Sequence, residues 1–262
     1  MEPSNPQTPG NTQQAQAKPE KCIMTSEDCG GDLKIIDSHV HLIDYDFDKE
    51  LPGVLSEACQ NGVTHLIENA THEETFAKVE KIYLVNSSVV TPSFGMHPWY
   101  LQNATDNWED LIRFYLKKYP KAFVGECGLD WIADQQTSRK DQKDFFTRQL
   151  TLARDFQRPV SVHCVRAHGD MLKIMKKNYK SPEKDTGYIQ KIIMHSWGGS
   201  KEIAQSLLKL EGAEIYLSFQ TNSTEKNFEI MKNMRDDRII VETDSPHQYN
   251  PIYNPSDFDA SP

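Results

Sequence analysis

The segment Lys34-Ile35-Ile36-Asp37-Ser38-His39-Val40-His41 decides between two folds that the rest of the sequence leaves open. It joins a short β-like run, Lys34–Asp37, to a pair of histidines, and it contains no glycine. An open doubly wound sheet that binds a dinucleotide carries a glycine-rich turn directly after its first strand. The sequence therefore favours the alternative, a closed barrel of parallel strands.

Seven more β-like runs follow the first at intervals of 23 to 37 residues. They are Val63–Ile67, Val89–Phe94, Ala122–Glu126, Pro159–His163, Lys191–His195, Glu214–Phe219 and Arg238–Glu242. Amphipathic stretches lie between them, such as Asp106–Tyr119, Ser138–Phe156 and Ala167–Tyr179. Strands that alternate with helices at this spacing form right-handed βαβ units, and eight such units close into a barrel. We predict an α/β fold, a TIM-type (β/α)8 barrel.

The composition is that of a globular protein, with 37% hydrophobic and 26% charged residues among 262. The longest apolar run is Ile82–Val85, whereas a membrane-spanning helix needs about 20 apolar residues. The first residues lack both the basic and the apolar part of a secretory signal. We therefore expect an intracellular protein without membrane contact, in the cytoplasm, with the nucleus as a second candidate compartment.

Cysteine content and charge narrow the class further. Five cysteines, an odd number without any CxxC pair, speak against a disulfide framework and against a zinc knuckle. The net charge of -9 and the absence of a long Lys/Arg block speak against a broad basic surface that wraps nucleic acid. A local site could still handle phosphates, because bound divalent cations would supply the positive charge.

Residues 1–32 differ from the rest of the chain. They are rich in Pro, Gln, Ser, Thr and Asn and lack a periodic apolar pattern. Such a segment buries too little apolar surface to offset the entropy of ordering. We predict a disordered polar tail over residues 1–32 and a single barrel domain over residues 33–262.

Side chains that can bind metal fall at the ends of five predicted strands. They are His39 and His41 after the first run, Glu126, His163 and His195 at the ends of the fourth, fifth and sixth, and Asp244 after the eighth. In a barrel these ends share one rim, where active sites are built. His39 and His41 are two residues apart on extended chain, so their side chains point the same way. Four imidazoles and two carboxylates suffice for two divalent cations if one carboxylate bridges.

The motifs around these residues resemble, in the same order, those of the TatD-related metal-dependent deoxyribonucleases. They are Asp37–His41, Gly95–Pro98, Gly125–Asp130, Pro159–His163, His195–Ser200 and Glu242–Pro246. The resemblance runs from about Lys34 to Pro246. It implies an amidohydrolase-like barrel that hydrolyses DNA, commonly as a 3′ to 5′ exonuclease on ends or single strands.

The resemblance also implies roles for the six candidate ligands. One metal would be held by His39, His41, Glu126 and Asp244, and the other by Glu126, His163 and His195. Glu126 would bridge the two metals, and Asp244 would act as the general base, because a carboxylate near a metal stays charged and can accept a proton. The resemblance implies Mg²⁺ or Mn²⁺, whereas the imidazole-rich ligand set also suits Zn²⁺.

This chain departs from the resemblance at two functional points. Many relatives carry an arginine two residues after the histidine of the fifth strand, but here that residue is Val165 and the arginine is Arg166. A phosphate-binding role for Arg166 is therefore open. The stretch Ser245–Pro262 is rich in proline where relatives continue into helices, so we expect the eighth helix to be missing or divergent.

Other side chains near the rim have both a structural and a functional interpretation. His97, in Gly-Met-His-Pro, is a donor to a substrate phosphate or a structural loop histidine. Trp99, Trp131 and Trp197 lie just beyond strand ends, where they pack or stack on an unpaired base. Asp130 is interpreted as a residue that orients a ligand or a loop.

Two other functions compete with DNA hydrolysis. Some TatD-like proteins remove D-amino acids from tRNA, so another ester such as a D-aminoacyl-tRNA is an alternative substrate. The second alternative is a catalytically weak barrel that serves as a binding scaffold, although the presence of all six ligand residues argues against it.

Overall fold

The computed structural model describes residue 29 and residues 34–133, 136–180, 187–221 and 223–248. In this part of the chain eight parallel strands form one sheet in the order of the sequence. The strands are β1 (Ile35–Val40), β2 (Val63–Asn69), β3 (Val90–Phe94), β4 (Phe123–Asp130), β5 (Val160–Val165), β6 (Lys191–Met194), β7 (Glu214–Phe219) and β8 (Ile239–Val241). The helices are α1 (Leu51–Gln60), α2 (Glu73–Val85), α3 (Trp108–Lys118), α4 (Arg139–Asp155), α5 (His168–Asn178), α6 (Lys201–Leu207) and α7 (Glu225–Met231).

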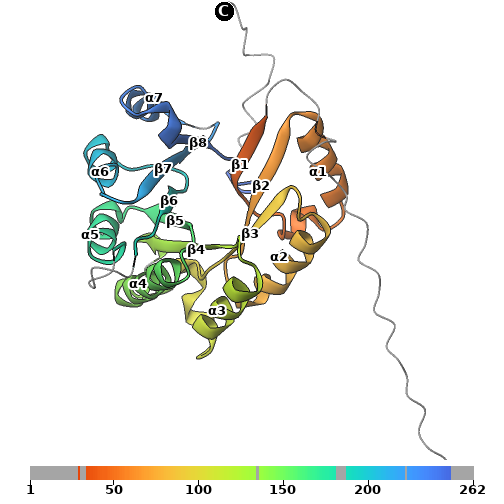
Figure 1. Cartoon of the computed structure of the whole chain (residues 1–262), viewed down its shortest axis with the longest axis horizontal. Coiled ribbons are helices and arrows are strands. Elements are labelled where there is room, and N and C mark those ends of the chain that lie inside the picture. The colour runs from red at the N-terminus through yellow and green to blue at the C-terminus, as the bar shows by residue number, and fades with distance from the viewer. Residues whose placement is uncertain (1–28, 30–33, 134–135, 181–186, 222, 249–262) are drawn as a thin grey trace, which may run out of the picture.

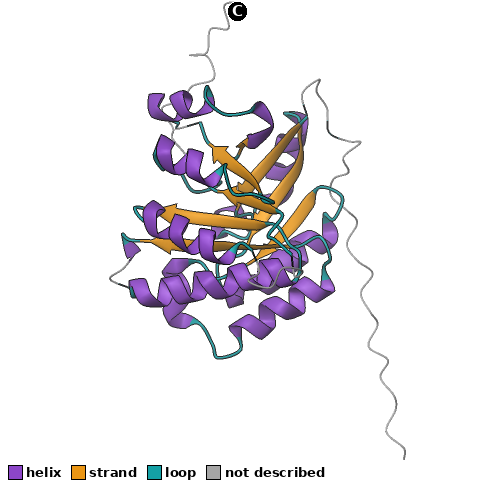
Figure 2. Cartoon of the chain, turned by 60° about the vertical axis from the view of Figure 1, so that its left-hand side comes forward, coloured by secondary structure: helices purple, strands orange, loops and turns teal. Residues whose placement is uncertain are grey.

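The helices lie around the outside of the strands, one after each of β1 to β7 (Figures 1 and 2). Short 3-10 helices, η1 (Tyr45–Phe47), η2 (Pro98–Asn103) and η4 (Asp236–Arg238), lie in the connections. Strand residues that face the helices are apolar and buried, as in Ile192 and Met194 of β6. This architecture confirms the predicted TIM-type (β/α)8 barrel.

Backbone hydrogen bonds join the carboxyl end of β1 to the segment that follows β8. The backbone N–H of Asp244 donates to the carbonyl of His39 at 2.9 Å, and the N–H of His41 donates to the carbonyl of Ser245 at the same distance. Beyond β8 the chain therefore continues along β1. These two hydrogen bonds bring the ends of the sequence motifs around His39 and Asp244 side by side.

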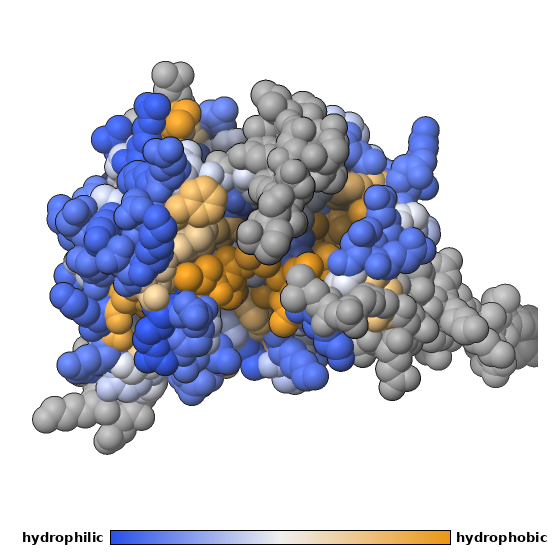
Figure 3. Space-filling model, turned by 90° about the horizontal axis from the view of Figure 1, so that it is seen from above, coloured by the Kyte–Doolittle hydropathy of each residue, from blue (hydrophilic) through white to orange (hydrophobic). Residues whose placement is uncertain are grey.

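The barrel interior changes from apolar to polar along its axis. Near the strand starts, residues such as Ile36, Ile193 and Ile240 line an apolar cavity of about 280 Å³. On the outside of the barrel, between α7 and α1, hydrophobic residues lie between hydrophilic ones (Figure 3). Above this cavity lies a layer of buried serines, in which the hydroxyls of Ser38 and Ser218 lie 2.8 Å apart. Small side chains at this level leave room for larger groups above them.

Some expectations fall outside the described residues. Apart from residue 29, the predicted tail over residues 1–32 lies outside them, as does the stretch after residue 248 in which the eighth helix was expected to be missing or divergent. Within the described ranges, no helix combines the length and the apolarity that a bilayer crossing requires.

Candidate metal centre

Glu126 lies at the centre of the polar cluster above the serine layer. Its Oε2 is 3.4 Å from Nε2 of His39 and 3.5 Å from Nε2 of His41. Its Oε1 lies 2.9 Å from Nδ1 of His163 and 3.7 Å from Nε2 of His195. The two oxygens of one buried carboxylate therefore face two different pairs of imidazoles.

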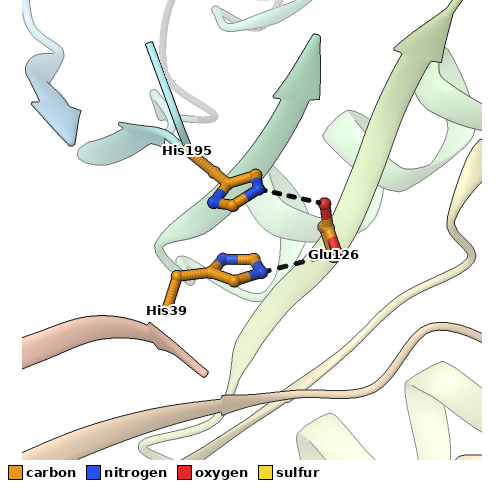
Figure 4. Close-up of side chains that lie close together, drawn as sticks. All are labelled: His39, Glu126 and His195. Carbon is orange, nitrogen blue, oxygen red and sulfur yellow. Dashed lines mark ion pairs between the residues drawn. The ribbon is translucent and has the colours of Figure 1, made fainter. Parts of the chain in front are cut away.

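His39 and His195 approach Glu126 from neighbouring directions (Figure 4). Their rings are stacked with centroids 3.7 Å apart, and both present Nε2 to the carboxylate. Asp244 completes this side of the cluster, with Oδ1 3.4 Å from Nε2 of His41 and 3.7 Å from Nε2 of His39. All six predicted ligand residues thus come together at one end of the barrel.

The outer nitrogens of three imidazoles have partners that orient the rings. Nδ1 of His41 lies 2.9 Å from the carbonyl oxygen of Asn69. Nδ1 of His195 lies 2.8 Å from Glu242, and Nε2 of His163 lies 3.2 Å from Asp130. In metal sites the ring N–H of a ligating histidine characteristically donates to such an acceptor, so that the other nitrogen presents its lone pair to the metal.

The inner nitrogens fit a cation. Nε2 of His39 and Nε2 of His41 lie 3.2 Å apart, close to oxygens of both Glu126 and Asp244. Two lone pairs in such proximity repel unless a proton or a metal ion lies between them. Within the described residues, three overlapping groups each have three ligand atoms within 4.8 Å of one another, close enough to hold a metal ion: His39 with Glu126 and His195, His39 with His41 and Asp244, and His97 with Glu126 and His163.

The charges in the cluster shift one another's pKa values. Burial favours neutral imidazole, but the hydrogen bond to Asp244 and the charge of Glu126 outweigh it and raise the pKa of His41 to about 9. For His195, burial is likewise outweighed by Glu242, and the pKa rises to about 10. Burial would raise the pKa of Asp244, but His41 and His195 hold it below its usual range. The carboxylates therefore stay ionised, and the cluster has the anionic groups that a cation requires.

His97 differs from the other imidazoles of the cluster. Its Nδ1 accepts a hydrogen bond from the N–H of Trp99 at 3.2 Å, at the start of η2. Burial lowers its pKa to about 3, so the ring is neutral. A neutral ring that accepts at Nδ1 carries its proton on Nε2, which lies 3.6 Å from Glu126. His97 is therefore oriented as a hydrogen-bond donor toward the centre of the cluster.

Strands β4 and β5 approach closely because two positions on β4 are glycines. A Cβ on Gly128 would lie 1.9 Å from the carbonyl oxygen of His163. A Cβ on Gly125 would lie 2.7 Å from the carbonyl oxygen of Ser161, and the φ angle of Gly125 is +146°. The glycines on either side of Glu126 therefore bring its strand against the strand that carries His163.

The residues expected to bind substrate have different surroundings. A cavity of about 330 Å³ opens over the cluster, and Val165 lines it, whereas Arg166 is exposed beyond it. Trp131 is half-buried, with the guanidinium of Arg139 4.9 Å from its ring centre. Trp197 is 3% exposed and packs in the hydrophobic core, and it is not among the residues that line this cavity. Among the three rim tryptophans, Trp99 lines the cavity.

Several residues that position the site were not singled out from the sequence. Glu242 contacts His195, and its position at the end of the predicted run Arg238–Glu242, like that of the other rim residues, could have indicated a place in the site. Gln142 and Gln149 are buried on α4, where they hydrogen-bond the backbone at Asp130 and Met96. Their seven-residue spacing on the apolar face of an amphipathic helix is a detectable signal.

A barrel that gathers imidazoles and carboxylates at its carboxyl-terminal rim is characteristic of a metal-dependent hydrolase. Comparison with known proteins identifies the family. Residues 36–257 match the family described as TatD related DNase, and the chain belongs to this family. It is a metal-dependent hydrolase.

Individual relatives agree with this assignment. The metal-dependent hydrolase YabD of Bacillus subtilis is 30% identical over 220 residues, which cover 81% of this chain and 80% of YabD. The human 3'-5' RNA nuclease TATDN2 is 30% identical over 207 residues, which cover 77% of this chain but 24% of TATDN2. The crystal structure of YJJV, a TatD homologue from Escherichia coli, superposes with a TM-score of 0.70 at 25% identity, covering 81% of this chain and 80% of that protein.

Proposed function

We propose that this hydrolase is a nuclease that removes nucleotides in the 3′ to 5′ direction from single-stranded or frayed DNA ends. The observation that carries the proposal is the position of Glu126, whose two oxygens face two pairs of imidazoles. A carboxylate in this position can bridge two divalent cations, and paired cations suit the displacement of an ester oxygen by the oxygen of a water molecule. The family name, TatD related DNase, supports DNA as the substrate.

The proposed ligands of the two cations follow from the arrangement of the side chains. His39, His41 and Asp244 would hold one, His163 and His195 the other, and Glu126 both. When bound, divalent cations supply Lewis-acid charge and activate water for attack on a phosphate ester. Mg²⁺ and Mn²⁺ are the proposed ions, and the imidazoles also suit Zn²⁺.

The chain's own groups would position the substrate and move the proton. Asp244 is the proposed general base, because it is ionised and its Oδ2 lies at the cavity, where Gln248 donates to it at 2.7 Å. Nε2–H of His97 would donate to a phosphate oxygen, and exposed Arg166 would approach a neighbouring phosphate. The ring of Trp131, already covered by Arg139, would contribute through that cation rather than by stacking.

RNA is a second candidate substrate, because the relative TATDN2 is described as an RNA nuclease. A D-aminoacyl-tRNA ester is the alternative from a different substrate class. Each of the three predicts a different product from the same cluster of side chains.

The test is cleavage of a single-stranded DNA oligonucleotide labelled at its 5′ end, beside an RNA of the same sequence and a D-aminoacyl-tRNA. We expect a ladder of DNA shortened from the 3′ end in Mg²⁺ or Mn²⁺, and no cleavage with a chelator. Glu126→Gln and Asp244→Asn should each lower the rate at least about 100-fold, while Glu57→Gln, an exposed carboxylate on α1, should not. Intact DNA beside hydrolysed RNA or aminoacyl-tRNA would contradict DNA as the substrate.

A further inference from the structure

One wall of the cavity over the metal centre is apolar and exposed. Trp99 is 48% exposed and Ile132 is 59% exposed, and both line this cavity with Tyr100 and Val165. Large apolar side chains that remain exposed beside a polar cluster mark a contact surface rather than a core. The described residues that line the cavity include no lysine and no arginine.

The ring of Trp99 is exposed but held in place. Its Nε1–H donates to Oδ2 of Asp130 at 2.7 Å, and the same oxygen lies 3.2 Å from Nε2 of His163. Oδ1 of Asp130 accepts from the N–H of Ile132 at 2.7 Å, so one buried carboxylate fixes both sides of the wall. The rings of Trp99 and His97 also pack edge to face, with centroids 5.3 Å apart. A platform that is already ordered loses little entropy when a ligand covers it.

The geometry points to Trp99 as the stacking platform for the base of the nucleotide beside the scissile bond. This inference rests on the proposed nuclease function and names the group that the site recognises. A flat base gains contact with an indole face whatever its sequence. Phosphates further along the strand find no cationic side chain on the described lining of the cavity, so stacking rather than phosphate contact selects the substrate there.

A preference for unpaired ends follows from stacking. In a duplex the terminal base is paired with its partner and stacked on one neighbour, so this pair must open before the base can turn into the cavity and lie against Trp99. The site therefore takes single-stranded or frayed ends without a sequence preference, and blunt duplex ends react more slowly.

The test compares two short single-stranded DNA oligonucleotides, one natural and one with an abasic residue at its 3′ end. Binding is measured by fluorescence anisotropy in Ca²⁺, and cleavage is measured in Mg²⁺ or Mn²⁺. The protein should favour the natural end by about tenfold or more in both measurements. In Trp99→Ala this preference should fall to about one, with the abasic oligonucleotide bound nearly as well as before. Trp99→Phe should keep most of the preference, because a ring remains.

Two controls separate stacking from a structural role of Trp99. Phe114→Ala removes an exposed aromatic ring on α3 and should leave the preference unchanged. If Trp99 acted by holding Asp130 and His163, Trp99→Ala would weaken natural and abasic oligonucleotides equally, and that result would overturn the inference. The dissociation constant should also vary weakly with salt, with a logarithmic slope no greater than about 0.7, the value for one phosphate contact on a single strand.

The outcomes also separate this inference from the proposed function. Cleavage of both oligonucleotides at equal rates would contradict the stacking role of Trp99 and support the proposed nuclease function. Base-dependent binding that requires Trp99 without cleavage in any metal would retain the platform and contradict the nuclease. Binding of neither oligonucleotide would contradict both.

Discussion

At the scale of single residues, the orientation of each imidazole depends on the group behind it. Glu242 is buried and lies 2.8 Å from Nδ1 of His195, and it also accepts hydrogen bonds from Gln220 and from the N–H of Ser196. These contacts hold the carboxylate still, so that His195 presents Nε2 to Glu126. Partners of this kind tune metal affinity although they do not touch the metal.

We predict that Glu242→Gln lowers the affinity for a divalent cation by about 10- to 100-fold. The amide keeps the size of the side chain but removes the charge that faces Nδ1 of His195. Titration calorimetry with Mn²⁺ measures the change, and saturating metal should restore most of the hydrolytic activity. Glu214→Gln, a half-exposed carboxylate on β7, is the matched control. Equal metal affinity in Glu242→Gln and the native chain would show that Glu242 does not position the ligand.

The distance of His97 from its neighbours does not by itself define its role in the cluster. Distance alone groups His97 with Glu126 and His163 as a candidate ligand set. The hydrogen bond from the N–H of Trp99 places the proton of His97 on Nε2 instead. We predict that His97→Ala leaves the number of bound ions unchanged and lowers kcat/KM by about 100-fold, as expected for loss of a donor to the reacting group. Loss of an ion per chain in this variant would make His97 a ligand.

At the scale of elements, two buried glutamines on α4 hold two segments of the rim in place through hydrogen bonds. Oε1 of Gln149 accepts from the N–H of Met96 at 2.7 Å, and its Nε2 donates to the carbonyl of Met96 at 3.1 Å. Gln142 makes the equivalent pair of bonds with the backbone of Asp130. Helix α4 thereby fixes the backbone of Met96, which precedes His97, and of Asp130, which accepts the hydrogen bond from Trp99.

We predict that Gln149→Leu destabilises the protein by about 2 to 4 kcal/mol, because two buried backbone groups of Met96 lose their partners. Urea denaturation followed by circular dichroism measures this loss. Gln205→Leu, at an exposed glutamine on α6, should change the free energy of unfolding by less than about 0.5 kcal/mol. Similar stability for the two variants would contradict a positioning role for Gln149.

The elements also show what sequence patterns can predict. The run Glu214–Phe219 coincides with β7, and the helix expected over Ser138–Phe156 forms over Arg139–Asp155. The first run was expected to end at Asp37, but β1 continues to Val40, because pairing with β2 and contacts with the segment after β8 extend it. Local patterns specify where strands exist, whereas tertiary hydrogen bonds specify where they end.

The candidate site likewise has a part that the sequence predicts and a part that it does not. Ligand residues at strand ends are predictable, because parallel strands in a barrel share one rim. The burial of Trp197 and the exposure of Trp99 depend instead on how loops pack against α5, α7 and Asp130, and their sequence positions just beyond strand ends look alike. Tautomers and orienting contacts, such as those of His97 and Glu242, likewise require coordinates.

At the scale of the whole molecule, the metal centre links parts of the chain that are distant in sequence. A backbone hydrogen bond joins His39 on β1 to Asp244 beyond β8. The side chains of both residues lie in the same cluster as Glu126 of β4. A cation that binds this cluster therefore stabilises the folded state against unfolding. At a free-metal concentration 100 times the dissociation constant, the gain is about 2.7 kcal/mol.

We predict that Mn²⁺ at this concentration raises the melting temperature by about 5 to 10 °C over the chelator-treated protein. Differential scanning calorimetry measures the shift. Glu126→Ala should show a clearly smaller shift, because the carboxylate shared by both groups of imidazoles is gone. An equal shift in both proteins would place the stabilising metal elsewhere.

The most direct test of the metal centre is a count of bound ions after equilibrium dialysis against Mn²⁺, by elemental analysis of the native chain and of Glu126→Ala. The proposed bridging role predicts two ions per native chain and at most one in Glu126→Ala. A native chain that binds no ion, or a variant that binds as many ions as the native chain, would contradict the role of Glu126 at the centre of the site.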